Sequence, residues 1–411
     1  MNNDPTYNIP LDKNLRELVH EQKDNNAILA KIANKMGAFT EPDNWPAIKE
    51  YVNDGIMHHF YPVGSQIIDT YQNVPNGTEY AMPWDVAHYD EEESVYLKTH
   101  FALPDAMVYD EPEAIYYFAG TETAGDHYIA IGSAYGEGWS TSKAIQITLS
   151  EAPAADDQLV INCGTNYSID PTNGREWKVY AKGSTTVKQS GTTSNGTSGT
   201  PLGTIGSESA QKPNGRLNAI SRVVYGYGRY SQSAIRQRLN SEAAAGAWWT
   251  PQNPWDRPPA EAATTRGFLA GCSEGFLSIL EPVDVVTALN TVEGHEATYE
   301  TTHDRIFLPS LQEMYITPQL ANVEGEDWDY FKELAQEAGL SGKFAWYNTY
   351  PILRAFRLDA QTSPVYVWLR SAGRGSAGGA WDVNSSGSVN DGGSACNSFR
   401  GCPACKLKKS E

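Results

Sequence analysis

Hydrophobic positions change their spacing along this chain, and the changes divide it into three parts. Between residues 8 and 36 apolar side chains recur at alternating intervals of four and three, which predicts a helix that begins after Pro10 and ends at Gly37. The positions on this stripe are Leu11, Leu15, Leu18, Gln22, Asn25, Leu29, Ile32 and Met36. The spacing fits a coiled-coil seam, in which Gln22 and Asn25 would set the register, and it equally fits a single amphipathic helix packed on its own domain.

Short runs of β-forming residues follow, from about residue 58 to residue 212. Turn residues separate these runs at spacings expected for an antiparallel β-sandwich. The six predicted strands are Ser94–Lys98, Ala114–Phe118, His127–Ile131, Ala144–Leu149, Gln158–Ile161 and Glu176–Tyr180. The composition of Ser190–Gly199 predicts a loop or linker, and we place a domain boundary near Lys212.

Mixed helices and strands without a β-α-β rhythm fill the rest of the chain, which indicates an α+β domain. One short helix is predicted over Ser231–Leu239, with Ala234, Ile235 and Leu239 on its inner face and Arg236 and Arg238 pointing elsewhere. A second is predicted over Asp327–Ala338, with an inner stripe of Trp328, Phe331, Leu334 and Ala335. The predicted organisation is therefore an N-terminal helical segment for oligomerisation or attachment (1–57), an all-β sandwich (58–212) and an α+β domain (213–411).

The last forty residues combine two kinds of position. Bulky residues are spaced through a background of Gly, Ser, Ala, Asn and Asp, and from Leu369 to Cys405 there is no Lys, Glu, Gln or Met. An Asn codon whose adenines are randomised cannot reach any of those four residues. A flexible linker would not carry Trp368, Trp381, Val383 and Val389, which need burial. The pattern predicts a folded surface with constant interior positions and changeable exposed positions.

This C-terminal run resembles the variable region of the target proteins of diversity-generating retroelements, among which the phage tropism determinants are best known. The resemblance rests on Trp368–Ala372, Ala380-Trp381-x-Val383, Gly387-x-Val389, Arg400 and Pro403–Cys405. Upstream it extends through Tyr230–Asn240, Trp248–Asn253 and Arg305–Ser310, so that it covers roughly the last half of the chain. It implies a C-type lectin fold for residues 213–411, with the variable region at about 367–405.

Strand alternation and this resemblance together nominate the varied, ligand-binding and solvent-facing positions. They are Gly373, Gly375, Ser376, Gly378, Gly379, Asp382, Asn384, Ser388, Asn390, Asp391, Gly392, Gly393, Cys396, Asn397, Ser398 and Phe399. Ser385, Ser386 and Gly387 read as a turn. The expected scaffold is Trp368, Arg370, Trp381, Val383, Val389 and Arg400, where each guanidinium holds loop carbonyls or a carboxylate in place rather than a ligand. Because Phe399 is the one aromatic residue of the set, we expect a shallow, polar surface of weak monovalent affinity.

Net charge and cysteine usage narrow the classes of partner. A formal charge of −19 argues against binding to nucleic-acid phosphates. The chain contains no apolar run long enough to span a bilayer and its N-terminus lacks the pattern of a secretory signal, so we expect no membrane insertion. Five cysteines do not describe a disulfide framework, and Cys402-Pro-Ala-Cys405 lacks the second pair that a zinc site needs.

Motifs of catalysis are absent from the sequence, which favours a protein that is not an enzyme. No G-x-S-x-G elbow, P-loop or G-x-G-x-x-G opens a helix after a strand, and Gly294-His-Glu-Ala lacks the second His of a zinc protease. We expect no cofactor. Structural calcium stays open, because the acidic runs Asp90–Glu93 and Glu324–Asp327 offer carboxylate oxygens.

The sequence therefore predicts a non-enzymatic receptor-binding protein, most plausibly a phage or prophage tail component located in the virion. Its expected partners are a host cell-surface protein or glycan, other tail proteins and further copies of the chain, in a trimer. A bacterial surface adhesin is an alternative. A formylglycine-generating oxidase, whose fold the resemblance also implies, is a third reading, with Cys396, Cys402 and Cys405 as the nearby thiols.

Overall fold

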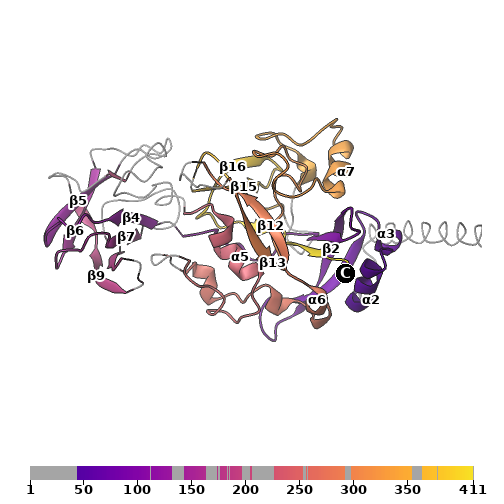
Figure 1. Cartoon of the computed structure of the whole chain (residues 1–411), viewed down its shortest axis with the longest axis horizontal. Helices are drawn as coiled ribbons and strands as arrows, with labels where there is room; N and C mark the ends of the chain where they lie inside the picture. Colours follow the sequence, from indigo (N-terminus) through magenta and orange to yellow (C-terminus); the bar gives the residue numbers. More distant parts are fainter. Residues whose placement is uncertain are drawn as a thin grey trace, which may run out of the picture.

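Two stretches of the chain that lie far apart in sequence build one hydrophobic core. The computed structural model describes residues 44–111, 113–131, 143–162, 174, 176–182, 184, 186–196, 204–205, 226–252, 256, 258–291, 298–353, 363–376 and 378–410. It is mostly β-sheet with few helices (Figure 1). The core cluster contains buried residues from 45–109 and from 230–407, and none from 113–205.

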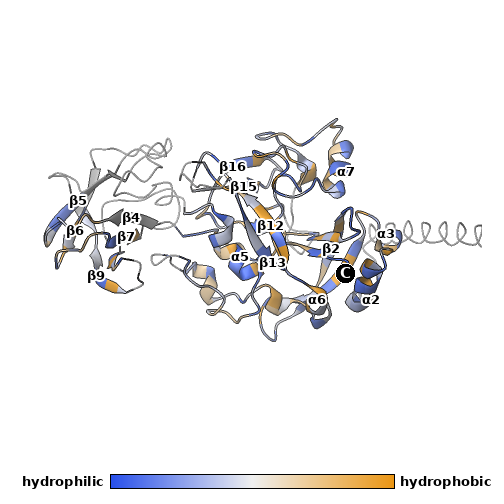
Figure 2. Cartoon of the chain, in the orientation of Figure 1, coloured by the Kyte–Doolittle hydropathy of each residue, from blue (hydrophilic) through white to orange (hydrophobic). Residues whose placement is uncertain are grey.

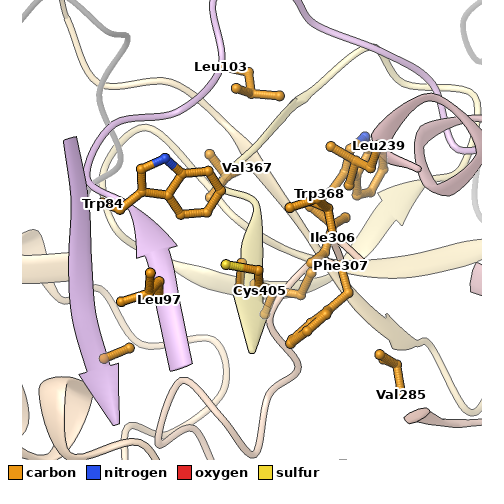
Figure 3. Packing of buried hydrophobic residues seen from close by; sticks show 14 of the residues in the cluster. Trp84, Leu97, Leu103, Leu239, Val285, Ile306, Phe307, Val367, Trp368 and Cys405 are labelled. Carbon is orange, nitrogen blue, oxygen red and sulfur yellow. The ribbon is translucent and has the colours of Figure 1, made fainter. Parts of the chain in front are cut away.

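An antiparallel four-stranded sheet joins these two stretches. Its order is β1 (Gln66–Gln72), β2 (Glu79–Tyr89), β3 (Val95–Thr99) and β18 (Ala404–Leu407). Leu97 lies opposite Cys405, so the end of the chain pairs with a strand some 300 residues earlier. In Figure 3 Trp84 and Leu97 approach Cys405 from one side, while Ile306 and Phe307 approach it from the other.

Several helices and one hairpin cover this core. They are α2 (Trp45–Asn53), α3 (Met57–Phe60), η2 (Tyr230–Gln232), α5 (Ala234–Leu239), η3 (Ala260–Ala263), η4 (Leu269–Gly271), α6 (Glu274–Ile279), α7 (Asp329–Glu337) and η5 (Pro351–Leu353), with the hairpin β12 (Val283–Ala288) and β13 (Tyr299–Asp304). Pro46 near the start of α2 and the Asn44 cap begin that helix, and the Trp45 ring packs 4.6 Å from Phe276 of α6. Hydrophilic and hydrophobic residues alternate along α2 and α7 (Figure 2), as expected of helices with one buried face.

A further four-stranded sheet, which carries the predicted variable region and which we call the variable-region sheet, completes this body. Its order is β16 (Val389–Ser394), β15 (Gly379–Val383), β14 (Val367–Ala372) and β17 (Arg400–Gly401). The β14–β15 and β15–β16 pairs are antiparallel, and both contain a shift of register. β17 pairs with β14 in parallel. The strand β16 is therefore an edge of the sheet.

Residues 113–205 form two further four-stranded sheets, which stand beside the main body in Figure 1. One has the order β4 (Glu113–Tyr117), β7 (Gln158–Asn162), β8 (Glu176–Tyr180) and β9 (Val187–Thr192). The other has the order β10 (Ser194–Gly196), β6 (Lys143–Leu149), β5 (Gly125–Ile131) and β11 (Thr204–Ile205). This arrangement is compatible with a β-sandwich. All six strands predicted from alternation are present, with ends shifted by up to two residues.

The predicted division between a sandwich at 58–212 and a second domain at 213–411 is wrong at its first boundary. β1, β2 and β3 belong to the main body, because β3 pairs with β18, and α2 packs there as well. Ser190–Gly199 is predicted to be a loop or linker, but β9 and β10 occupy most of it. Gly191 is required within β9, because a Cβ there would lie 2.6 Å from the Trp177 ring of the neighbouring strand. The predicted N-terminal helix (8–36) and Gly294-His-Glu lie outside the described residues.

Both short helices of the second half form close to the predicted positions. α5 buries Ala234, Ile235 and Leu239, and α7 buries Phe331 and Ala335 behind Trp328 at its N-cap. Arg238 corrects the prediction for the first helix. Its side chain is buried, and it bonds to Asp105 at 2.5 Å and to the Arg266 carbonyl at 3.2 Å, because a guanidinium with these acceptors can be buried.

The two connections to the sheets of 113–205 meet at the surface of the main body, where the Tyr227 backbone N–H donates to Asp110 at 3.0 Å. We therefore expect a chain in which a short Gly/Ser bridge replaces residues 113–225 to keep the main body folded. Its unfolding in urea should be one cooperative transition with near-ultraviolet circular dichroism retained. A variant that loses this signal would show that the main body needs the segment it lacks.

Candidate functional site

The variable-region sheet aligns its buried residues across three strands. Val367, Val383 and Val389 lie directly opposite one another and share one face of the sheet. Trp368 and Asp382 are also opposite one another, one residue along, and so share the other face. All five side chains are buried, and Val383 and Val389 are completely so. Trp381, which lies between Ala380 and Asp382 in β15, is also completely buried. The inward orientation predicted for the bulky residues is observed.

The face that carries Trp381 is covered by the segment before η5. The Trp346 ring lies 5.3 Å from the Trp381 ring, and the Trp381 indole N–H donates to the Gln319 side chain at 3.2 Å. Backbone bonds fix the covering segment to the sheet, since the Tyr347 N–H donates to the Val389 carbonyl at 2.8 Å. The covering segment therefore closes this face around Trp381 and Val389.

The opposite face, which carries Trp368 and Asp382, is covered as well. The Trp368 indole N–H donates to the Met107 carbonyl at 2.9 Å, and its ring lies 5.0 Å from Tyr109 and 4.5 Å from Phe399. A Cβ on Gly393 would lie 2.6 Å from the Trp368 ring and 2.8 Å from a carboxylate oxygen of Asp382. Gly393 therefore lies beneath the tryptophan and has no space for a side chain.

Burial on both faces corrects the predicted solvent-facing set. Seven of its members are buried, namely Gly373, Gly378, Gly379, Asp382, Ser388, Gly393 and Cys396. The alternation rule expects one face of a strand to meet water, and it fails where covering segments pack on both sides. Gly392 lies within β16. The exposed or half-exposed members are Gly375, Ser376, Asn384, Asn390, Asp391, Asn397, Ser398 and Phe399.

These eight positions, which we call the open positions, lie on loops and on the edge strand. The loop at Gly375 is held at Arg374, whose guanidinium donates to the Leu289 carbonyl at 2.9 Å. The turn after β15 is held by Asn384, whose side-chain oxygen accepts the backbone N–H groups of Ser386 and Ser388, each at 2.9 Å. Both loops thus have anchoring hydrogen bonds, and those of the turn after β15 depend on the Asn384 side chain itself.

Two exposed tyrosines flank the open positions and were not predicted as binding residues. Tyr347 is 61% exposed, and its backbone is held at a φ of 57° beside β16. Tyr366 is 42% exposed and stacks on Phe399 with ring centroids 4.7 Å apart. Tyrosine supplies rigid contact area at binding surfaces. In the sequence Tyr347 is one of several aromatic residues between Phe344 and Tyr350, and nothing in that run distinguishes the exposed one.

Arg370 serves the main body and not a ligand, as the sequence predicted. Its guanidinium is 1% exposed and pairs with Glu313, with one N–H···O distance of 2.9 Å. It also donates to the carbonyls of Leu308 (2.9 Å), Glu324 (2.7 Å) and Val286 (3.2 Å). Arg400, the other scaffold arginine, is half-buried at the start of β17.

The thiols of Cys402 and Cys405 are shielded by the protein and not available to a metal ion in ionised form. Burial raises the pKa of Cys402 to about 11 and that of Cys405 further, so both thiols stay protonated at neutral pH.

The acidic runs also bond within the protein. Asp90 accepts the backbone N–H of Ser94 and pairs with Lys406 at 2.6 Å. Glu324 is buried and accepts bonds from Ser371 and from the backbone of Ala288. No cluster of three His, Cys, Asp or Glu side chains able to hold a metal ion occurs within the described ranges.

Asp382 is the one strongly perturbed carboxyl of this sheet. Burial, only partly opposed by the hydrogen bond from the Asn390 side chain and assisted by the nearby Asp391 charge, raises its pKa to about 8. One carboxylate oxygen makes no hydrogen bond to any described residue. The protein holds this group in its protonated form at neutral pH, because a buried charge without a partner is costly.

This burial predicts a pH-dependent stability. Between pH 4 and 8 the folded protein keeps the Asp382 proton while the unfolded chain has released its own, so stability falls with rising pH, by up to about 1.4 kcal/mol per unit. In Asp382→Asn this decline should be absent. Urea unfolding at pH 5.5 and 8 measures it, with Asp284→Asn on exposed β12 as the control; equal slopes in all three proteins would contradict the assignment.

Among the described residues, no helix has both the length and the apolar character that a membrane span requires.

The comparisons with known proteins add one similarity. Residues 216–409 match the family model described as a domain of unknown function (DUF6273). No curated protein and no solved structure matches the chain. The matched range covers the open positions and the whole variable-region sheet, together with β18 but without β1–β3, to which β18 pairs.

Proposed function

We propose that this protein is a non-enzymatic receptor-binding protein that presents a retroelement-diversified surface on a C-type-lectin-like domain. The observation that carries the proposal is the separation of roles along residues 367–405. Side chains at the open positions are drawn only from residues that adenine-randomised Asn codons can reach, whereas the frame around Trp368, Arg370 and Trp381 is buried and bonded. Such a frame lets exposed side chains change at little cost in stability.

The geometry favours a binding surface built from loops and one sheet edge. Asn390 and Ser398 offer adaptable hydrogen-bonding groups, whereas the Asn384 side chain anchors its turn, and the exposed ring of Tyr347 offers constant contact area beside them. The surface therefore offers more aromatic contact area than the predicted variable positions alone provide. A ligand would meet one constant tyrosine and a changing set of small polar side chains.

Several copies of the surface would act together. Small polar contacts give weak monovalent binding, and avidity between linked copies can offset this by orders of magnitude. We propose that the chain forms a trimer and is a component of a phage or prophage tail in the virion, where the N-terminal segment attaches it to other tail proteins. A host cell-surface protein or glycan is the proposed ligand.

The DNA around the gene gives the sharpest test of diversification. We expect a reverse-transcriptase gene and a near-copy of the 3′ end of this gene, differing almost only where the near-copy has adenine. The differences should fall in codons of open positions such as Asn390 and Ser398 and spare those of Trp381 and Val389. Differences spread evenly over buried and exposed codons would refute the proposal.

Two glycines test which positions tolerate variation. A Cβ on Gly375 would meet no atom within 4 Å, whereas a Cβ on Gly393 would strike Trp368 and Asp382. We expect Gly375→Ser to leave the free energy of unfolding within about 0.5 kcal/mol and Gly393→Ser to lower it by about 1–3 kcal/mol. Urea denaturation of the two matched variants measures the difference, and equal values would show that the covering of this face is wrong.

A further inference from the structure

A pocket of about 200 Å³ lies inside the main body, behind the variable-region sheet. Its apolar wall comes from α7, through Phe331 and Leu334, and from β14, through Val367 and Trp368. Leu334 is half-exposed, whereas Phe331 and Val367 are buried, so the pocket opens beside α7. Nothing in the proposed receptor-binding function uses this space.

The other end of the pocket is polar. Lys98 and His100 line it, and both lie against Asp85 on the side away from the pocket. The Lys98 ammonium is 2.8 Å from one Asp85 oxygen, and the His100 Nδ1 is 2.9 Å from the other. The Asp85 side chain is buried, is not part of the lining and also accepts a hydrogen bond from Gln66 at 3.1 Å.

This arrangement turns donors toward the pocket and keeps the carboxylate behind them. The Lys98 ammonium has three N–H donors, and its bonds to Asp85 and to the Thr99 carbonyl occupy two. The Tyr330 ring lies 4.5 Å from the ammonium and forms part of the same wall. Lys98 is only 6% exposed, so its charge is weakly hydrated and a bound anion would interact with it strongly.

Two neighbouring groups that could carry negative charge are neutral. Burial raises the pKa of the Cys402 thiol to about 11, and burial likewise raises the pKa of the Tyr330 hydroxyl. Burial alone would raise the pKa of Asp85, but the Lys98 charge and the hydrogen bonds from His100 and Lys98 outweigh it and lower that pKa, so this carboxylate stays ionised beside Lys98. The lining therefore presents cationic and neutral groups, with no anionic side chain among the described lining residues.

We propose that this pocket binds a small organic carboxylate with a flat apolar body. The carboxylate would take up the remaining donor of Lys98, with His100 beside it. The apolar body would lie between Phe331, Leu334 and Val367. This assigns the site a ligand class, an arylalkyl or arylalkenyl acid, which nothing else about the chain suggests.

The test uses three probes of one shape and different charge: cinnamate, cinnamamide and cinnamylamine. Isothermal titration calorimetry with the full chain should give a Kd for cinnamate of about 1 mM or tighter. Cinnamamide should bind about tenfold more weakly, because it lacks the charge-assisted bond, and cinnamylamine should not bind measurably. Absence of cinnamate binding, or equal binding of the amide or the amine, overturns the proposal.

A matched pair of variants on α7 ties the binding to this pocket. Leu334→Trp places an indole in the pocket and should abolish cinnamate binding, whereas Glu333→Trp places the same group on the exposed side and should leave the Kd unchanged. Retained binding in Leu334→Trp means that cinnamate sits elsewhere, which refutes the assignment.

Protection of a cysteine gives a readout that needs no variant. Cys402 lines the pocket and is half-buried, and Cys272, also half-buried, does not line it. Saturating cinnamate should slow alkylation of Cys402 by N-ethylmaleimide several-fold and leave Cys272 unaffected, as followed by peptide mass spectrometry. Equal rates at Cys402 with and without cinnamate contradict the proposed site.

Discussion

The buried guanidinium of Arg370 is the interaction on which the main body most depends. From β14 it reaches Glu313 and the carbonyls of Leu308, Glu324 and Val286, so one side chain joins the variable-region sheet to β12 and to two loops. Removing one partner of such a buried pair typically costs about 3–5 kcal/mol, because the other charge is left without compensation. If the exposed positions of this stretch vary as we propose, the cost of changing Arg370 explains why it would stay constant among them.

Because both faces of the variable-region sheet are covered, new side chains can be accommodated only away from these faces. Trp346 packs on one face through Trp381, while Met107 and Tyr109 pack on the other through Trp368. What reaches water is the edge strand β16 and the loops that leave the sheet. A surface made of loops and an edge gives variety in side chains without variety in backbone, provided that the anchoring bonds, such as those to Asn384, are kept.

Local pattern predicted much of this protein, and the failures share one physical origin. The six predicted strands, of which β3 lies in the main body, and the helices α5 and α7 follow from the spacing of apolar residues, which acts over a few positions. The pairing of β3 with β18 and the packing of α2 on α6 join segments hundreds of residues apart, and the spacing of side chains does not encode the partner. The burial of Asp382 and Gly393 is likewise not encoded locally, because it is imposed by Trp368 and by the distant segment at Met107 that holds the Trp368 indole. Arg370 was predictable because a bulky cation within a run of small residues needs a fixed set of acceptors.

Trp368 connects the two regions to which we assign binding. Its ring meets Phe399, an open position, and its neighbour Val367 in β14 lines the pocket on the other face of the sheet. A smaller residue at position 399 would remove a contact that holds the Trp368 ring in place. If both sites bind as proposed, they share β14 as a wall, and coupling between them requires a shift of this strand between two packed positions. The identity of residue 399 would then affect the pocket without touching its ligand, which makes it the least independent of the open positions.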